Sequence, residues 1–299
     1  MVSSPVTVET RMNNIEHRSR ISSASILNAC AVALALVCLL LATGCDKLKA
    51  RDNLNKGVQA YKSARFETAI DYFKKAVQLD PGLVNARLYL ATAYSQQYIP
   101  GADTPENNQF AQQAIDVYKQ ILSGDTTKEQ KLMALKGMAS LYFGMKKMDD
   151  AKQYHQQVLQ LDPNDPDTYY SIGVIDWTET YHDAAELKSK EGLKVDDDIV
   201  KDRKLAKLCQ AVKEKNEAKV NEGIQMLNKA LELRKDYDDA MAYLNLMYRR
   251  KADIECGDEG AREADIKTAQ EWVDKTLQTK KEKAERAAGP GGITAEPTR

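Results

Sequence analysis

The side chains of this 299-residue chain that could do chemistry are few and widely spaced. His155 and His182 are the histidines that follow the apolar N-terminal region, and neither has a His or Cys neighbour at metal-site spacing. Asp196, Asp197 and Asp198 lack the spaced oxygen ligands and the glycine of a calcium loop. No Walker-type loop, GxGxxG, HExxH or GxSxG motif occurs. The sequence therefore predicts no enzyme activity, no bound metal and no cofactor.

The same side chains have ordinary structural roles. Helical periodicity places His155 at a core-facing position, where we expect a packed imidazole, and His182 at the exposed start of a helix. The three acids before Ile199 suit the start of a helix, where the macrodipole favours negative charge. These interpretations leave no pair of carboxylates that stands out for acid–base work.

Three of the five cysteines, Cys45, Cys209 and Cys256, follow residue 44. In an oxidising compartment Cys209 and Cys256 could form a disulfide. Two buried or idle thiols are the alternative, because spacing in the sequence does not fix geometry.

Composition narrows the class of protein. The 43 Lys and Arg balance 44 Asp and Glu, so the net charge is −1 and offers no basic field for nucleic acid. Hydrophobic residues make up 43%, which is typical of a folded chain rather than a disordered one. Helix-forming residues dominate over Gly and Pro, so we expect helices rather than a β-sandwich.

The N-terminal region has the pattern of an export signal. An apolar run extends from Ile26 to Ala42, and its length of about 17 residues is short for a membrane span. Three arginines precede this run: Arg11, Arg18 and Arg20. Residues Leu41 to Cys45 read Leu-Ala-Thr-Gly-Cys and resemble a bacterial lipobox. That resemblance implies a signal peptide over residues 1–44, starting at Met1 or Met12, and lipid on Cys45; an uncleaved anchor is the alternative.

Small and apolar residues recur at helical spacing from Asn55 onward. In the first such segment they are Gly57, Tyr61, Phe66, Ala69, Phe73, Ala76 and Pro81. This pattern resembles the 34-residue tetratricopeptide repeat, a pair of packed helices. Small residues allow the two helices to cross closely, large residues fill the gaps between hairpins, and proline ends the second helix.

The small residue of each second helix can be followed along the chain. It recurs at Ala69, Ala114, Ala151, Ala185, Gly223 and Ala269. Every interval is 34 residues or longer, so the extra residues must lie in loops, such as the one that ends with Thr104 as N-cap and Pro105 in the first helical turn. We predict an all-α fold, a right-handed α-solenoid of about six hairpins over residues 45–280. Four hairpins are clear, whereas the fourth and fifth are degenerate, and residues 281–299 are predicted to be a disordered tail.

The resemblance also implies a concave groove lined by the first helix of each hairpin. The residues predicted to face it are Tyr61, Lys62, Thr92, Gln96, Ser140, Phe143, Tyr170, Val174, Trp177, Leu246, Arg249 and Arg250. Aromatic side chains beside cations suit an extended peptide that carries acidic groups. The alternative is that the aromatics pack between hairpins and that the arginines are solvated or paired with neighbouring acids.

These features together predict an exported, membrane-anchored scaffold or adaptor that binds a protein partner or extended peptide and no nucleic acid. Its layout is similar to that of lipoproteins in envelope, secretion or pilus assembly. Lipid on Cys45 would hold it in a bacterial envelope facing the periplasm, at the outer membrane in preference to the inner. The alternative is a periplasmic carrier or sensor of a small ligand or cell-wall fragment, which would need an enclosed polar pocket. The sequence assigns neither the partner nor the oligomeric state.

Overall fold

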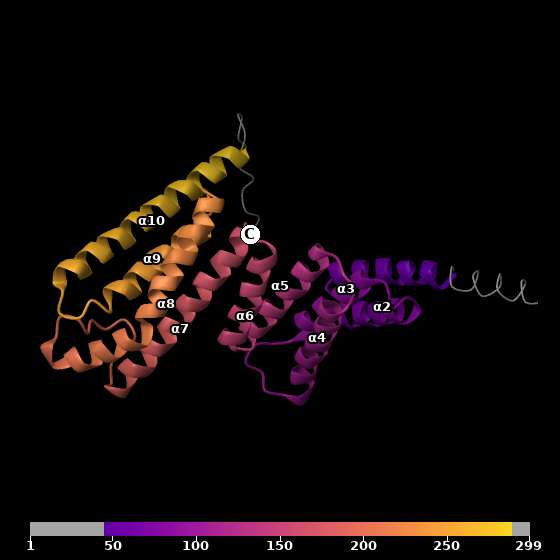
Figure 1. The fold of residues 1–299 in the computed structure, drawn as a ribbon, viewed down its shortest axis with the longest axis horizontal. Helices are drawn as coiled ribbons and strands as arrows, with labels where there is room; N and C mark the ends of the chain where they lie inside the picture. Colours follow the sequence, from indigo (N-terminus) through magenta and orange to yellow (C-terminus); the bar gives the residue numbers. More distant parts are fainter. Residues whose placement is uncertain (1–44, 289–299) are drawn as a thin grey trace, which may run out of the picture.

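The described chain is a row of helices joined by short connections (Figure 1). The computed structural model describes residues 45–288, so the predicted signal peptide over 1–44 and residues 289–299 lie outside it. A first helix covers residues 45–62. The helices that follow are α2 (Phe66–Leu79), α3 (Val84–Gln97), α4 (Pro105–Ser123), α5 (Lys128–Gly144), α6 (Met148–Leu161), α7 (Pro166–Lys190), α8 (Ala206–Leu233), α9 (Asp238–Ala252) and α10 (Glu259–Ala288), with a short 3-10 helix at Arg203–Leu205.

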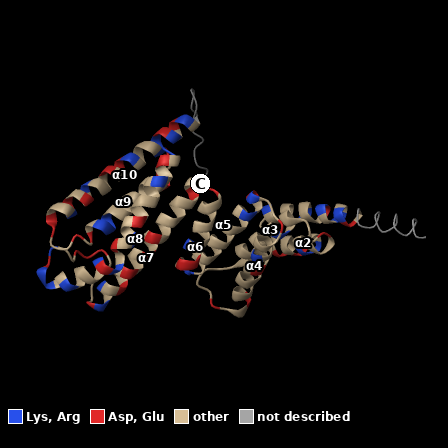
Figure 2. Cartoon of the chain, in the orientation of Figure 1, with Lys and Arg blue, Asp and Glu red and all other residues tan. Residues whose placement is uncertain are grey.

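Consecutive helices pack against each other in hairpins, and the predicted all-α solenoid is confirmed. The helix-start signals behave as expected: the Thr104 hydroxyl accepts the Asn107 N–H at 3.2 Å, and Pro105 occupies the first turn of α4. Small residues at the predicted crossings, Ala69, Ala114, Ala151 and Ala269, have no exposed surface. Charged residues of both signs are distributed along the helices (Figure 2).

The described helices form five hairpins rather than about six. The fourth and fifth predicted hairpins merge into one, made of the long helices α7 and α8. No glycine or proline interrupts residues 174–190, so nothing ends α7 at the expected turn. Ala184 therefore enters the core in place of the predicted Ala185, and His182 lies exposed inside α7 rather than at a helix start.

The C-terminal boundary of the fold also differs from the prediction. Helix α10 continues to Ala288, eight residues beyond the predicted end of the solenoid at 280, so residues 281–288 are helical rather than disordered. This last part of α10 lacks apolar periodicity and is held by ion pairs instead. Lys283 pairs with Asp238, and Arg286 lies 3.3 Å from Asp236. The part of the predicted tail over 289–299 lies outside the described residues.

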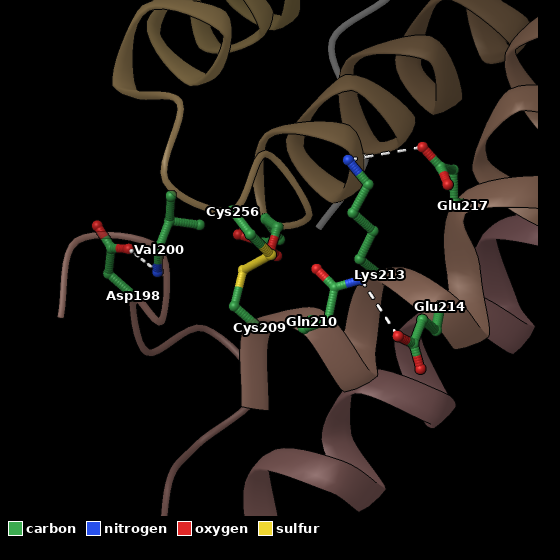
Figure 3. The surroundings of a disulfide bond; sticks show 9 residues. Asp198, Val200, Cys209, Gln210, Lys213, Glu214, Glu217 and Cys256 are labelled. Carbon is green, nitrogen blue, oxygen red and sulfur yellow. Dashed lines mark hydrogen bonds and ion pairs between the residues drawn. A yellow bond between two sulfur atoms is a disulfide. The ribbon is translucent and has the colours of Figure 1, made fainter. Parts of the chain in front are cut away.

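A disulfide joins Cys209 of α8 to Cys256 of the connection between α9 and α10, where the sequence left pairing open (Figure 3). The carbonyl oxygen of Asp253 lies 3.8 Å from the Cys209 sulfur, and the Asp253 carboxylate lies 4.0 Å from the ammonium of Lys188. Lys188 is fully buried at the end of α7, and burial lowers its pKa. The disulfide therefore lies in a corner that ties α7, α8 and the α9–α10 connection together.

Asp196, Asp197 and Asp198 lie in the loop before α8, not at the start of a helix as expected. The buried Lys188 holds this loop, because its ammonium donates to the carbonyl oxygen of Asp197 at 2.9 Å. The carboxylate of Asp198 accepts a hydrogen bond from Arg262 at 2.8 Å. Contacts with these cations thus take the place of the helix-start role.

The apolar side chains form two separate clusters. One extends from the first helix to α5 and contains the buried Phe73, Tyr118 and Met138. The other extends from α7 to α10 and contains Leu227 and Met247. Helix α6 and the α6–α7 turn lie between their buried members, so this junction sets how the two halves of the solenoid meet.

Helices α7 and α8 approach closely at Gly173. A Cβ atom on Gly173 would lie 2.6 Å from Leu227 Cγ and 3.3 Å from the carbonyl oxygen of Gly223. Such contacts force the two helix backbones apart, since the branch carbon of a buried leucine cannot swing away. The pairing of α7 with α8 therefore depends on the absence of a side chain at this position.

We predict that Gly173→Ala lowers the free energy of unfolding by about 1–3 kcal/mol, because the added methyl group overpacks the α7–α8 contact. The matched control is Gly144→Ala, whose Cβ would meet Pro100 Cγ at an ordinary 3.7 Å. That change should leave the stability equal or raise it by up to about 1 kcal/mol. Urea unfolding followed by circular dichroism measures both, and equal stabilities for the two variants would contradict the packing argument.

Candidate functional site

A trough lies at the junction of the two clusters, between α5 and the first half of α7. It consists of two adjoining hollows of about 250 and 560 Å³ that share Ser140 and Phe143. The smaller hollow is lined by Lys136, Ser140, Phe143, His155, Asp167, Thr168, Tyr170, Ser171, Val174 and Ile175. The larger is lined by Ser95, Gln96, Tyr98, Pro100, Ser140, Leu141, Phe143, Gly144, Lys146, Met148, Thr178 and His182. We call the two together the junction trough.

The start of α7 is fixed by charged contacts, and this fixes one wall of the trough. Asp165, just before α7, is buried and lies 2.6 Å from the ammonium of Lys136 on α5, while Thr168 donates to it at 2.5 Å. Asp167 accepts two hydrogen bonds from Arg234, at 2.8 and 3.0 Å. The Arg234 guanidinium lowers the pKa of Asp167, so the carboxylate stays ionised at neutral pH.

His155 of α6 lines the smaller hollow and is 8% exposed, which agrees with the expected packed imidazole. Its Nδ1 has no hydrogen-bond partner among the described residues. Burial lowers its pKa to about 4, so the imidazole is neutral at physiological pH. His155 therefore adds no charge to the smaller hollow. Phe143, Val174 and Ile175 give it an apolar lining, and its charged lining residues are Lys136 and Asp167.

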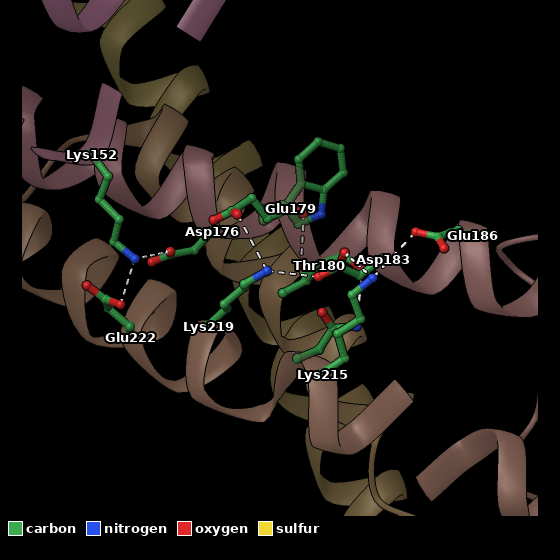
Figure 4. Close-up of polar contacts among 11 residues, drawn as sticks. Lys152, Asp176, Glu179, Thr180, Asp183, Glu186, Lys215, Lys219 and Glu222 are labelled. Carbon is green, nitrogen blue, oxygen red and sulfur yellow. Dashed lines mark hydrogen bonds and ion pairs between the residues drawn. The ribbon is translucent and has the colours of Figure 1, made fainter. Parts of the chain in front are cut away.

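A cluster of ion pairs that includes a buried carboxylate connects α6 to α7 and α8. Lys152 of α6 reaches both Asp176 of α7 and Glu222 of α8 at 2.7 Å (Figure 4). Asp176 has no exposed surface, and its Oδ2 has no hydrogen-bond partner among the described residues. Burial raises the pKa of Asp176 to about 7 despite the nearby ammonium. The ionised form of Asp176 is thus unfavourable, and the ammonium of Lys152 is the cation that stabilises it.

The structure brings five of the twelve predicted groove residues together in the junction trough. These are Gln96, Ser140, Phe143, Tyr170 and Val174. Other predicted residues pack elsewhere: Tyr61 contacts the ring of Phe66, and the Thr92 hydroxyl lies 3.4 Å from that of Tyr118. Lys62 is exposed at the end of the first helix.

The C-terminal members of the predicted groove do not line the trough. Trp177 packs edge-on against Tyr243, with ring centroids 5.5 Å apart. Arg250 is turned into ion pairs with Asp253 and Asp196, Arg249 is exposed and Leu246 is half-buried. For Trp177 and Arg250 the structure thus matches the packing and ion-pair alternatives.

Several trough residues are missing from the sequence prediction. Lys136, Thr168 and Ile175 line the smaller hollow because the α6–α7 turn brings the start of α7 against α5. The register of each repeat places residues on a helix face but does not give the angle between successive hairpins. The pairing of Asp165 with Lys136 could have been proposed from opposite charge, but nothing in their spacing selects this pair.

The described residues contain no group of three or more His, Cys, Asp or Glu side chains placed to hold a metal ion. Within residues 45–288, no helix combines the length and apolar character needed to cross a bilayer.

A family profile for the tetratricopeptide repeat matches residues 53–83 and 137–165. The first segment covers most of the first hairpin, and the second contains Ser140, Phe143 and His155 of the trough. The chain therefore contains tetratricopeptide repeats, and the second matched segment supplies one wall of the trough. A search of curated protein sequences found no match.

Solved structures with a similar fold include the crystal structure of MamA protein, which is 17% identical over 79% of this chain and 94% of that one, with a TM-score of 0.50. MamA 41-end from Desulfovibrio magneticus RS-1 is 16% identical over 78% of this chain and 96% of that one, with a TM-score of 0.48. YrrB, described as a TPR protein with an unusual peptide-binding site, is 15% identical over 77% and 85%, with a TM-score of 0.44. The likeness to MamA protein concerns the fold alone, and the two matched repeat segments identify this fold as an α-solenoid of tetratricopeptide type.

The two buried titratable groups near the trough should affect stability in opposite directions. Between pH 3.8 and about 7 native Asp176 holds a proton that the unfolded chain has released, so its contribution falls as pH rises. Between about pH 4 and 6.5 the unfolded chain binds a proton at His155 that the native state lacks, so this contribution rises with pH. The two effects oppose each other over the same range.

We therefore predict that removing either titratable group changes the slope of the unfolding free energy against pH by up to about 1.4 kcal/mol per pH unit. The two changes have opposite signs. Relative to the unmodified chain, Asp176→Asn should make stability rise more steeply from pH 4.5 to 6.5, and His155→Phe should make it fall. Urea unfolding at a series of pH values measures both slopes. Curves parallel to that of the unmodified chain would show that neither group has the environment described.

Proposed function

We propose that this chain is a membrane-anchored, exported scaffold that binds an extended segment of a partner protein in the junction trough. The observation that carries the proposal is the trough itself. Five of the residues predicted to face a partner line it, and its smaller hollow is mostly apolar. Tetratricopeptide repeats provide its α5–α6 wall.

The shape and charge of the trough favour a particular kind of segment. The smaller hollow, at about 250 Å³, is below the usual size of a small-molecule site, about 300–1,000 Å³, but suits one apolar side chain. The larger hollow is open and carries Lys146, which is exposed and forms no ion pair with the described residues. We propose that an apolar side chain enters the smaller hollow while an acidic side chain of the same segment meets Lys146.

Membrane anchoring rests on the sequence around Cys45. The Leu-Ala-Thr-Gly-Cys pattern resembles a lipobox, and Cys45 is exposed at the beginning of the first helix. We propose that Cys45 carries lipid after cleavage and that the solenoid faces the periplasm, at the outer membrane in preference to the inner. Such an anchor would hold the trough near partners that lie in or arrive at the membrane.

Site-specific photo-cross-linking in intact cells tests the binding site. A photoreactive residue at Ser140 should capture one dominant partner, whereas the same residue at Arg249, which lies outside the trough, should not. Adding Val174→Glu should lower the Ser140 yield at least about tenfold, because a charged carboxylate in place of Val174 prevents an apolar side chain from entering the mostly apolar hollow.

The Val174→Glu result decides whether capture reports binding in the trough. Its control is Ser171→Glu, at the more polar rim of the same hollow, with the folded fraction of each variant checked by circular dichroism. Equal capture from Ser140 and Arg249, or a yield that Val174→Glu leaves unchanged in a folded protein, would contradict the proposed site.

Lipid attachment is tested by Cys45→Ser. Without the thiol that accepts lipid, we expect the protein to leave the membrane fraction or to accumulate as the uncleaved precursor. Fractionation with intact mass measurement distinguishes the two outcomes. Unchanged membrane attachment together with unchanged processing would show that the lipobox interpretation is wrong.

A further inference from the structure

The first helix, over residues 45–62, presents a row of cations that pair with nothing in the described structure. At 100° per residue, Lys47, Arg51 and Lys62 fall within about 60° of one another on the helix surface. All three are exposed, and none lies within ion-pair distance of a described carboxylate. Figure 2 shows basic positions along this helix, at the end of the molecule. Another side of the helix, with Ala50 and Ala60, is buried against the hairpin.

The acids of the same helix do not neutralise this row. Asp46 lies 3.8 Å from Lys49, and Asp52 lies 2.7 Å from Lys56, so each acid is already paired with another lysine. The helix has five basic and two acidic residues and therefore a net charge of +3, in a chain whose overall charge is −1. The charge on this surface is thus local and specific to the helix that follows Cys45.

An exposed apolar side chain accompanies the cations. Leu48 is 71% exposed and lies about 40° from Lys62 around the helix, at the centre of the face opposite the core. An exposed leucine beside a row of cations on an outward helix face is an arrangement found in helices that lie in the interface of a bilayer. No described residue packs over this face.

We propose that the row formed by Lys47, Arg51 and Lys62, with Leu48 beside it, lies along a membrane surface rich in anionic lipid headgroups. The inference deepens the proposed function, because it rests on the proposed anchoring of the chain at its N-terminal end. Cations on this face meet headgroup phosphates, and Leu48 enters the acyl boundary. The helix then lies flat on the membrane, and the solenoid is held in one orientation instead of turning freely about a single tether.

Lysine footprinting of the full chain in vesicles tests the proposal. The chain is reconstituted into phosphatidylcholine vesicles with or without about one-third phosphatidylglycerol, and a water-soluble acylating reagent is applied. On the anionic vesicles we expect acylation of Lys62 to slow at least about threefold relative to neutral vesicles, and the rate to recover near 0.5 M salt. Lys119 and Lys128, which are exposed elsewhere on the solenoid, serve as internal references whose rates should not change.

Lys62 is the decisive position because it lies about 25 Å along the helix from Cys45, so a tether at Cys45 alone does not protect it. Arg51→Glu should abolish the protection of Lys62, whereas Lys128→Glu, the same charge change elsewhere, should leave it intact. Equal acylation of Lys62 on both vesicles, or protection that persists in Arg51→Glu, would overturn the proposal. The mass of the Cys45 peptide from the same digest reports lipidation separately, so failure of the anchor and failure of this contact are distinguished.

Discussion

Helix α7 must pack in two directions at once, and the rest of the structure depends on this constraint. Its Gly173 lies against Leu227 of α8, which pairs α7 with the C-terminal cluster. Its first residues are held to the other half by Asp165, through Lys136 of α5. Because the helix is unbroken from residue 166 to residue 190, it transmits one orientation from one half to the other. The junction trough is the space that remains between α5 and this fixed helix.

Polar groups at the junction fix the arrangement of its helices but lower the stability of the fold. Asp176 and His155 are both buried with an atom that lacks a hydrogen-bond partner among the described residues. Apolar residues of similar size would pack more cheaply at such positions. Lys152 contacts helices α7 and α8 together, so the charged pair selects one arrangement of three helices. Two buried groups with opposite responses to pH also limit how strongly the junction responds to acid.

The sequence predicts most of the fold because repeat packing is local. Ala69, Ala114 and Ala151 are buried where the register places them, since each depends only on its own hairpin. The fourth and fifth hairpins merge because no helix breaker follows Trp177. The sequence shows this absence, but the repeat pattern predicts a turn there. The trough was harder to predict, because the angle between α6 and α7 depends on contacts such as that of Lys136 with Asp165. Spacing therefore identified Phe143 and Val174 but also selected Arg250, whose charge is used in ion pairs.

The central claim is that a partner segment binds between α5 and α7, and hydrogen exchange of the folded chain with and without a binding peptide tests it most directly. The peptide is the tightest binder selected from a random peptide library displayed on phage. The account predicts slower amide exchange over residues 138–148 and 166–178, where α5 and α7 face each other, with no change over α9. Protection confined to α9, where Leu246, Arg249 and Arg250 lie, would contradict it.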